Sequence, residues 1–145
     1  MATIERYYDD VSEGDELDAL IRNPTEISLF RYSAVTWNAH RIHYDKSYAS
    51  EVEGHPGILV QAHLHGAYLQ QLVMNWMGPH GILRKLKWQN RNRAIAGEKL
   101  TCYGRVVEKY EEDGHFFVRC EIREENAEGL ICAPGEAVVE LPRRL

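Results

Sequence analysis

The sequence lacks long hydrophobic runs and any excess of positive charge. No window approaches the roughly 18 consecutive apolar residues that a membrane-spanning helix needs. The first residues lack the charged-then-apolar layout of a signal peptide. The formal net charge of −5 argues against nucleic acid as the main partner. There is no internal repeat and no low-complexity segment. These absences exclude membrane, fibrous and basic nucleic-acid-binding classes.

Cysteine is also scarce. The three cysteines are an odd number, have no metal-ligand spacing and lie in strand-like segments: Cys102, Cys120 and Cys132. This pattern predicts buried free thiols in a reducing compartment, so we expect a cytoplasmic protein.

What remains is an ordinary globular composition. The 145 residues are 44% hydrophobic and 27% charged. A chain of this length forms one core, so we expect a single domain over residues 1–145.

The first half of the chain predicts helices. Thr25 is an expected N-cap, and apolar residues recur at helical spacing after it. Gly78 and Pro79 end a longer apolar run. Because this run is apolar on most of its circumference, we expect a helix that is buried on most sides. The predicted elements are a strand over 17–22 and helices over 26–36, 46–52 and 61–76.

The second half changes character after Gly81. Apolar and polar residues alternate, and Asp113-Gly114 has the composition of a hairpin turn. Period two with one polar face predicts antiparallel strands that are wet on one side. The predicted strands cover 82–95, 99–110, 115–124 and 130–141. A buried helix followed by long strands predicts an α+β fold, with an antiparallel sheet wrapped around a central helix.

Histidines gather in the middle of the chain. Five of them fall within 26 residues: His40, His43, His55, His63 and His65. Imidazole exchanges protons near neutral pH more readily than other side chains. A polar, imidazole-rich loop that leads into a buried helix therefore indicates an active site.

Three fragments carry a family resemblance. They are Tyr7–Asp15 ahead of the first strand, Ile42-His43-Tyr44-Asp45 followed by Tyr48-Ala49, and Asn92–Leu100 ahead of a long strand. In this order the chain resembles the MaoC-like dehydratases and (R)-specific enoyl-thioester hydratases of the hot-dog fold. The type-2 3-hydroxyacyl-thioester dehydratases are the branch to which it is most similar.

The resemblance implies roles for particular residues. The family motif Asp-x-Asn-x-x-His falls on Asn38, His40 and His43. His43 is then the expected general acid–base residue. Asn38 or His40 is the expected second catalytic group, and the choice between them stays open. Asparagine stands where the family has aspartate, so the partner of His43 differs from the family pattern.

The start of the long helix is the expected site for the thioester oxygen. The family's His-Gly pair falls on Gln61 and Ala62. The free N–H of Ala62, with the helix dipole behind it, would stabilise negative charge on that oxygen. Gly66 is the rival if the helix begins one turn later.

The resemblance implies a lyase that hydrates or dehydrates enoyl or 3-hydroxyacyl thioesters of coenzyme A or acyl carrier protein. We expect no metal and no redox cofactor, because the thioester itself acidifies the Cα position. A metal site is disfavoured because His63 and His65 point apart on a helix. We expect a two-fold homodimer, possibly with further pairing or with another MaoC-like chain.

Two alternatives stay open. A hot-dog thioesterase would use a carboxylate to activate water, and its candidates are Asp45, Glu51 and Glu53. A non-catalytic subunit would pair with an active homologue. Separately, five positive charges over residues 84–93 form either the wet face of a strand or a docking patch for a phosphate-bearing carrier.

Overall fold

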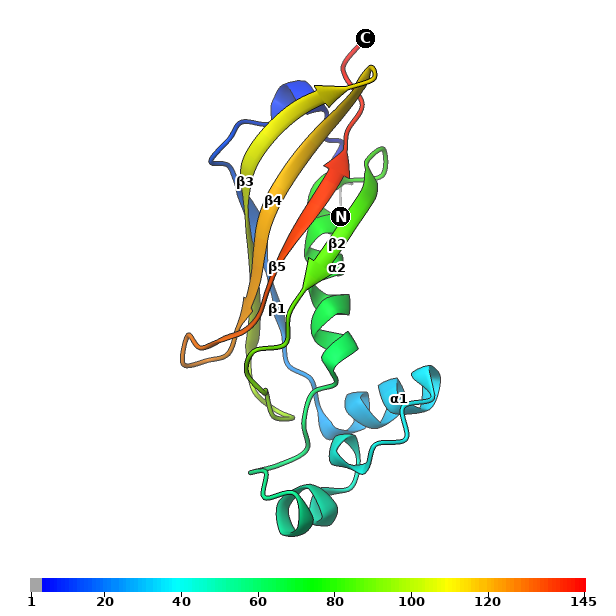
Figure 1. The fold of residues 1–145 in the computed structure, drawn as a ribbon, viewed down its shortest axis with the longest axis vertical. Helices are drawn as coiled ribbons and strands as arrows, with labels where there is room; N and C mark the ends of the chain where they lie inside the picture. The colour runs from blue at the N-terminus through cyan, green and yellow to red at the C-terminus, as the bar shows by residue number, and fades with distance from the viewer. Residues whose placement is uncertain (1–3) are drawn as a thin grey trace.

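A curved antiparallel sheet forms most of the molecule. The computed structural model describes residues 4–145. Within them the sheet has five strands in the order β1-β3-β4-β5-β2, and it curves along the long helix α2 (Figure 1). The strands are β1 (Glu16–Arg22), β2 (Ile82–Trp88), β3 (Leu100–Glu112), β4 (His115–Glu125) and β5 (Ile131–Glu140). The predicted α+β architecture is confirmed. Residues 1–3 of the predicted domain lie outside the described residues.

The predicted alternation is visible in burial. On β4, Val118, Cys120 and Ile122 are buried, while the side chain of Glu121 between them is exposed. The buried side chains pack against α2, with Leu69, Leu72, Val73 and Trp76 in the same cluster. One sheet face is therefore core, and the opposite face carries charged side chains. Cys102, Cys120 and Cys132 are buried and free, as predicted.

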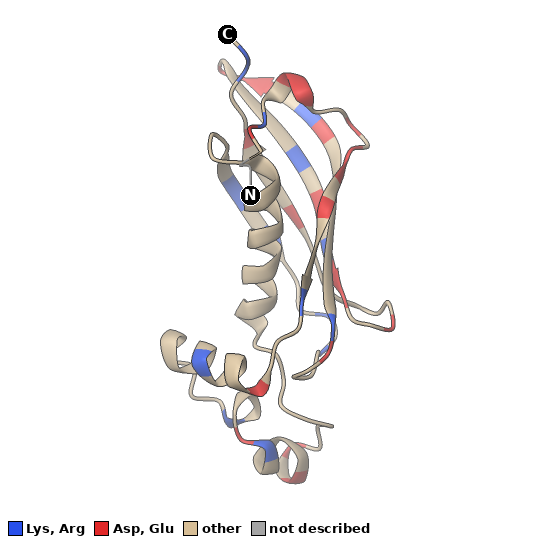
Figure 2. Ribbon diagram, turned by 180° about the vertical axis from the view of Figure 1, so that it is seen from behind, with Lys and Arg blue, Asp and Glu red and all other residues tan. Residues whose placement is uncertain are grey.

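The long helix α2 (Ala62–Met77) lies against the inner face of the sheet. It ends at Gly78, whose φ of 74° is available to glycine at little cost. The expectation of burial on most sides holds except along one face. Gln70, Gln71, Met74 and Asn75 form an exposed face, with Met74 46% exposed. Even this exposed face has no charged residue (Figure 2).

The segment between β1 and α2 projects beyond one end of the sheet (Figure 1). It contains α1 (Glu26–Thr36), η2 (Arg41–His43) and η3 (Tyr48–Val52). Thr25 caps α1 as predicted: its hydroxyl accepts from the Ser28 N–H at 3.1 Å. α1 buries only Leu29 and Ser33. A further short turn, η1 (Tyr8–Asp10), precedes β1.

The predicted strand over residues 82–95 is too long. β2 ends at Trp88, which pairs with Gly135 of β5. The Gln89 N–H still donates to Pro134 O at 2.9 Å, but Pro134 has no N–H to complete the ladder. Residues 89–99 instead form an irregular crossing to β3, with one bridge between Ile95 and Leu59.

None of the helices formed by residues 4–145 is both long and apolar enough to cross a membrane.

Candidate active site

His43 is held deep in the projecting segment. It is the last residue of η2 and is only 8% exposed. Its Nδ1–H donates to the carbonyl of Leu59 at 2.8 Å. Since Nδ1 carries that proton, the neutral ring has its lone pair on Nε2. This tautomer is the one that can accept a proton through Nε2.

The surroundings of His43 keep its ring neutral. Burial lowers its pKa below the ordinary value, the hydrogen bond to Leu59 acts in the opposite direction, and the neighbouring His40 lowers it further. The rings of His40 and His43 meet edge-on, with centroids 5.7 Å apart. A neutral, oriented imidazole is a competent general base at neutral pH.

A short two-stranded segment fixes this arrangement. The Leu59 N–H donates to Ile42 O at 3.0 Å, so Leu59 holds the middle and the last residue of η2. On its other side Leu59 faces Ile95, and Val60 N–H donates to Ala94 O at 2.9 Å. The loop that holds His43 is thereby tied to the crossing between β2 and β3.

Asn38 and His40 lie on the exposed side of the same loop. The Asn38 Oδ1 accepts from the His40 N–H at 3.2 Å, which shapes the turn after α1. Among residues 4–145, no hydrogen bond joins Asn38 to the His43 ring. His40, by contrast, contacts that ring directly.

The residue before Asn38 has an unusual backbone. Trp37 ends α1 with a φ of 57°, a left-handed conformation that bulky residues rarely adopt, and its side chain is 90% exposed. Beside it is a hollow of about 190 Å³. Apolar side chains predominate in its wall, which is formed by Phe30, Ser33, Ala34, Trp37, Asn38, Ala39 and Tyr44.

Helix α2 begins at Ala62, three residues after the carbonyl that holds His43. Within residues 4–145, the N–H groups of Ala62 and His63 have no acceptor. They are the first-turn donors at the positive end of the helix dipole. Ala62 therefore has the free N–H that its predicted role requires.

Gly66 and Gln61 were also predicted to contribute to the thioester-oxygen site, and the structure places them differently. Gly66 lies one turn inside α2, where N–H groups bond to helix carbonyls, so it cannot serve as a terminal donor. A Cβ at position 66 would come within 2.3 Å of the Trp88 ring, so glycine at this position leaves room for that ring.

The side chain of Gln61 is fully buried and turned toward α1. Its Nε2 donates to Leu29 O at 2.7 Å and to Ser33 Oγ at 3.0 Å. Gln61 therefore ties α1 to the start of α2 and does not cap that helix. Its Oε1 is buried with no protein partner within the described residues.

Sequence reasoning missed one buried polar cluster. His65 donates through Nδ1 to the carboxylate of Glu124, and both side chains are almost completely buried. The Cys102 thiol lies 3.7 Å from the other carboxylate oxygen. A signal was available: Glu124 continues the inward-facing series Val118, Cys120 and Ile122, so the alternation puts a carboxylate on the core face.

Within residues 4–145 there is no group of three or more histidine, cysteine, aspartate or glutamate side chains that could hold a metal ion.

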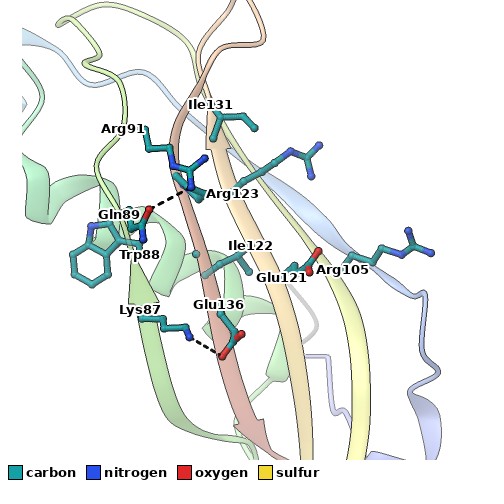
Figure 3. Close-up of a pocket in the computed structure, with 12 residues that line it drawn as sticks. Lys87, Trp88, Gln89, Arg91, Arg105, Glu121, Ile122, Arg123, Ile131 and Glu136 are labelled. Atoms are coloured by element: carbon teal, nitrogen blue, oxygen red, sulfur yellow. Dashed lines mark hydrogen bonds and ion pairs between the residues drawn. The ribbon is translucent and has the colours of Figure 1, made fainter.

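A larger hollow of about 670 Å³ lies on the outer sheet face (Figure 3). Charged side chains cross its floor, and Lys87 pairs there with Glu136 at 3.4 Å. No histidine, cysteine or serine lines it. Size alone does not make it the catalytic site, because it lacks an acid–base group poised near neutral pH.

Comparisons with known proteins agree with this architecture. The family model described as hydroxyacyl-thioester dehydratase type 2 matches residues 10–96. The (R)-hydratase PhaJ1 of Pseudomonas aeruginosa superposes with a TM-score of 0.85 over 95% of this chain and 86% of its own, at 22% identity. The (R)-hydratase of A. caviae gives 0.81 over 91% and 98%, at 17% identity. These likenesses confirm the predicted hot-dog fold.

Two curated relatives match in part. Mesaconyl-C(4)-CoA hydratase of Chloroflexus aurantiacus is 49% identical over 58 residues, which are 39% of this chain and 21% of the relative. The mitochondrial hydroxyacyl-thioester dehydratase type 2 of Saccharomyces cerevisiae is 30% identical over 81 residues, 54% of this chain and 28% of its own. The chain thus spans about a fifth to just over a quarter of the length of these relatives. The family match covers 87 of the 145 residues, more than half of the chain, and on this ground the protein belongs to the hydroxyacyl-thioester dehydratase type 2 family.

Proposed function

We propose that the protein is a lyase that reversibly hydrates enoyl thioesters and dehydrates 3-hydroxyacyl thioesters. The observation that carries this proposal is the buried His43, whose Nδ1–H bond to Leu59 leaves the Nε2 lone pair as a base. The hydratases and dehydratases to which the chain is similar support the reaction class.

The chemistry follows from the proposed roles. In hydration, His43 Nε2 takes a proton from water as the water oxygen bonds to Cβ of the enoyl group. The electron pair of the double bond moves toward the thioester, whose oxygen gains negative charge. The Ala62 N–H would stabilise that oxygen. The imidazolium then returns a proton to Cα, so water has been added and the base is regenerated.

The hollow beside Asn38 offers an apolar place for the acyl group. Asn38 is a positioning residue in this proposal, because an amide has no useful pKa and its oxygen already shapes the loop. His40 tunes His43 by its proximity.

The thioesterase alternative finds less support. Asp45 accepts the Tyr48 N–H at 3.0 Å and pairs with Arg41 at 2.7 Å. These contacts hold the Asp45 pKa below its ordinary value, so the carboxylate is a weak base. Glu53 accepts from the Tyr48 hydroxyl at 3.2 Å.

The test is an assay of the purified protein on enoyl-, 3-hydroxyacyl- and saturated acyl-thioesters. We expect loss of the enoyl chromophore on hydration, its appearance in the reverse direction, and no release of thiol. Thiol release without hydration would establish a thioesterase instead. No reaction in either assay would favour the non-catalytic subunit.

Replacing His40 with asparagine should move the acidic limb of the pH profile upward. The base must be neutral to accept a proton, so the rate rises as His43 loses its proton. His40 contributes to the lowered pKa of His43, and its removal raises that pKa toward the ordinary value. The measurement is kcat/KM for hydration against pH. If His40 is instead the second proton carrier, the basic limb should change and the maximal rate should fall.

We also propose that two copies pair around the uncharged face of α2 and the free edge of β2. Among the strands of residues 4–145, β2 pairs only with β5, so its other edge is open. Open edges and uncharged exposed faces are typical of subunit contacts. Light scattering at micromolar concentration should give twice the 16.7 kDa chain mass. Met74→Lys, which puts a charge on that face, should shift the protein toward monomer. A wild-type monomer would contradict this arrangement.

A further inference from the structure

The structure divides the basic run of residues 84–93 into two parts. Arg84 pairs with Glu140 at 2.5 Å and Lys87 with Glu136 at 3.4 Å, so β5 neutralises these two charges. Arg91 lies along the outer hollow and contacts the Gln89 side chain at 3.4 Å (Figure 3). Arg84 and Lys87 thus belong to the solvent-exposed face of β2, and Arg91 lies in the crossing that follows it. Arg93 behaves differently.

The Arg93 side chain contacts the loop that follows η3. Its Nη1–H donates to Nδ1 of His55 at 3.0 Å. Within residues 4–145, no carboxylate lies within ion-pair distance of Arg93. Because Nδ1 of His55 accepts, the ring proton is on Nε2, which is a second donor. The pair therefore combines an unneutralised guanidinium and an imidazole N–H in a protein with a net charge of −5.

This pair is joined to the His43 anchor through the backbone. Arg93 directly precedes Ala94, whose carbonyl accepts from Val60, and Ala96 donates to Ile58 O at 2.9 Å. Leu59, which holds His43, lies between those two contacts. His55 is itself fixed by its N–H bond to Ala49 O at 2.8 Å. Both side chains are at least partly exposed.

We propose that Arg93 and His55 bind the 4′-phosphate of the pantetheine arm that carries the acyl thioester. This proposal rests on the proposed function. A guanidinium grips a phosphate through parallel N–H···O bonds, and the imidazole N–H adds a third contact. Coenzyme A and acyl carrier protein both present this phosphate, so the site serves either carrier.

The test compares thioesters that differ only in the carrier. Crotonyl groups are presented on coenzyme A, on 4′-phosphopantetheine, on acyl carrier protein and on pantetheine, which lacks the phosphate. In Arg93→Gln, KM for the three phosphate-bearing substrates should rise roughly tenfold or more, the usual worth of a charge-assisted hydrogen bond. KM for crotonyl-pantetheine and kcat for all four should stay unchanged. Arg93→Lys should raise KM for the phosphate-bearing substrates less than Arg93→Gln does, and so should His55→Gln.

Arg91→Gln is the matched control, because it removes an equal charge two residues away on the outer face. It should leave all four substrates unaffected. An equal loss on crotonyl-pantetheine would make Arg93 a structural residue and overturn the proposal. A loss on coenzyme A but not on 4′-phosphopantetheine would assign the pair to the nucleotide phosphates and also overturn it. A changed sedimentation coefficient with unchanged KM would assign it to a contact between copies.

Calorimetry separates this inference from the proposed reaction. Titration of the wild type with 4′-phosphopantetheine and with pantetheine needs no turnover. Tighter binding of the phosphate form, lost in Arg93→Gln, supports the site even in a protein that hydrates nothing. Equal affinity for the two compounds, or no binding of either at millimolar concentration, would overturn it.

Discussion

Replacing His43 with asparagine is expected to lower the turnover of an enoyl thioester by roughly a hundredfold or more, the usual contribution of a general acid–base group. The asparagine amide has an N–H close to the position of Nδ1, so it can still donate to the Leu59 carbonyl. It has no group that can replace the Nε2 lone pair. The loop should therefore keep its shape while losing the base. The measurement is kcat for hydration under saturating substrate, with circular dichroism to verify folding.

Two comparisons complete this experiment. His43→Ala also loses the bond to Leu59 and should cost about 1 kcal/mol more in stability than His43→Asn, since a buried carbonyl is left without its donor. His80→Gln serves as the control, because His80 is an exposed histidine beyond the far end of α2. The His80→Gln protein should hydrate the enoyl thioester at the wild-type rate. A folded His43→Asn protein with an unchanged rate would remove the proposed mechanism.

The elements that the sequence predicted well are those specified by local signals. The start of α1 follows from Pro24 and the Thr25 cap, and the start of α2 was displaced by one residue. The strand error over residues 82–95 arose on the partner strand: the Gln89 N–H still donates to Pro134 O, but Pro134 has no N–H to return the bond, and regular pairing stops at Trp88. Pairing partners far along the chain are not specified by the local pattern.

In the candidate site, too, local motifs were predictable from the sequence and contacts between distant segments were not. The motif predicted an acid–base role for His43, which stays a prediction, and the structure shows that its side chain is buried. The orientation of Gln61 was not predictable, because its partners Leu29 and Ser33 lie some 30 residues earlier, on another helix. Whether Asn38 or His40 contacts the His43 ring depends on the turn after α1, where Trp37 takes a left-handed backbone. Sequence spacing cannot distinguish these outcomes.

Replacing Glu124 with alanine is expected to lower the free energy of unfolding by about 3–5 kcal/mol, the usual cost of removing one partner of a buried pair. The carboxylate is fully buried and accepts from His65 Nδ1, so its loss leaves a buried donor without an acceptor and opens a cavity. Glu124→Gln keeps an acceptor and the volume, so it should cost less. Urea-induced unfolding, followed by tryptophan fluorescence, measures both.

Glu121→Ala is the matched control for Glu124→Ala. It removes the same side chain from the same strand on the exposed face, and its effect should stay within about 0.5 kcal/mol. A Glu124→Ala protein as stable as Glu121→Ala would mean that the His65 contact contributes nothing to stability.

The double variant His65→Leu/Glu124→Leu tests whether the pair serves packing alone or also the reaction. Buried polar groups are costly to desolvate, so two leucines should restore most of the stability lost in Glu124→Ala. If the double variant also hydrates thioesters at the wild-type rate, the pair serves packing alone. If it is stable but slow, the pair holds the first turn of α2, and with it the Ala62 N–H, in the position that the reaction needs.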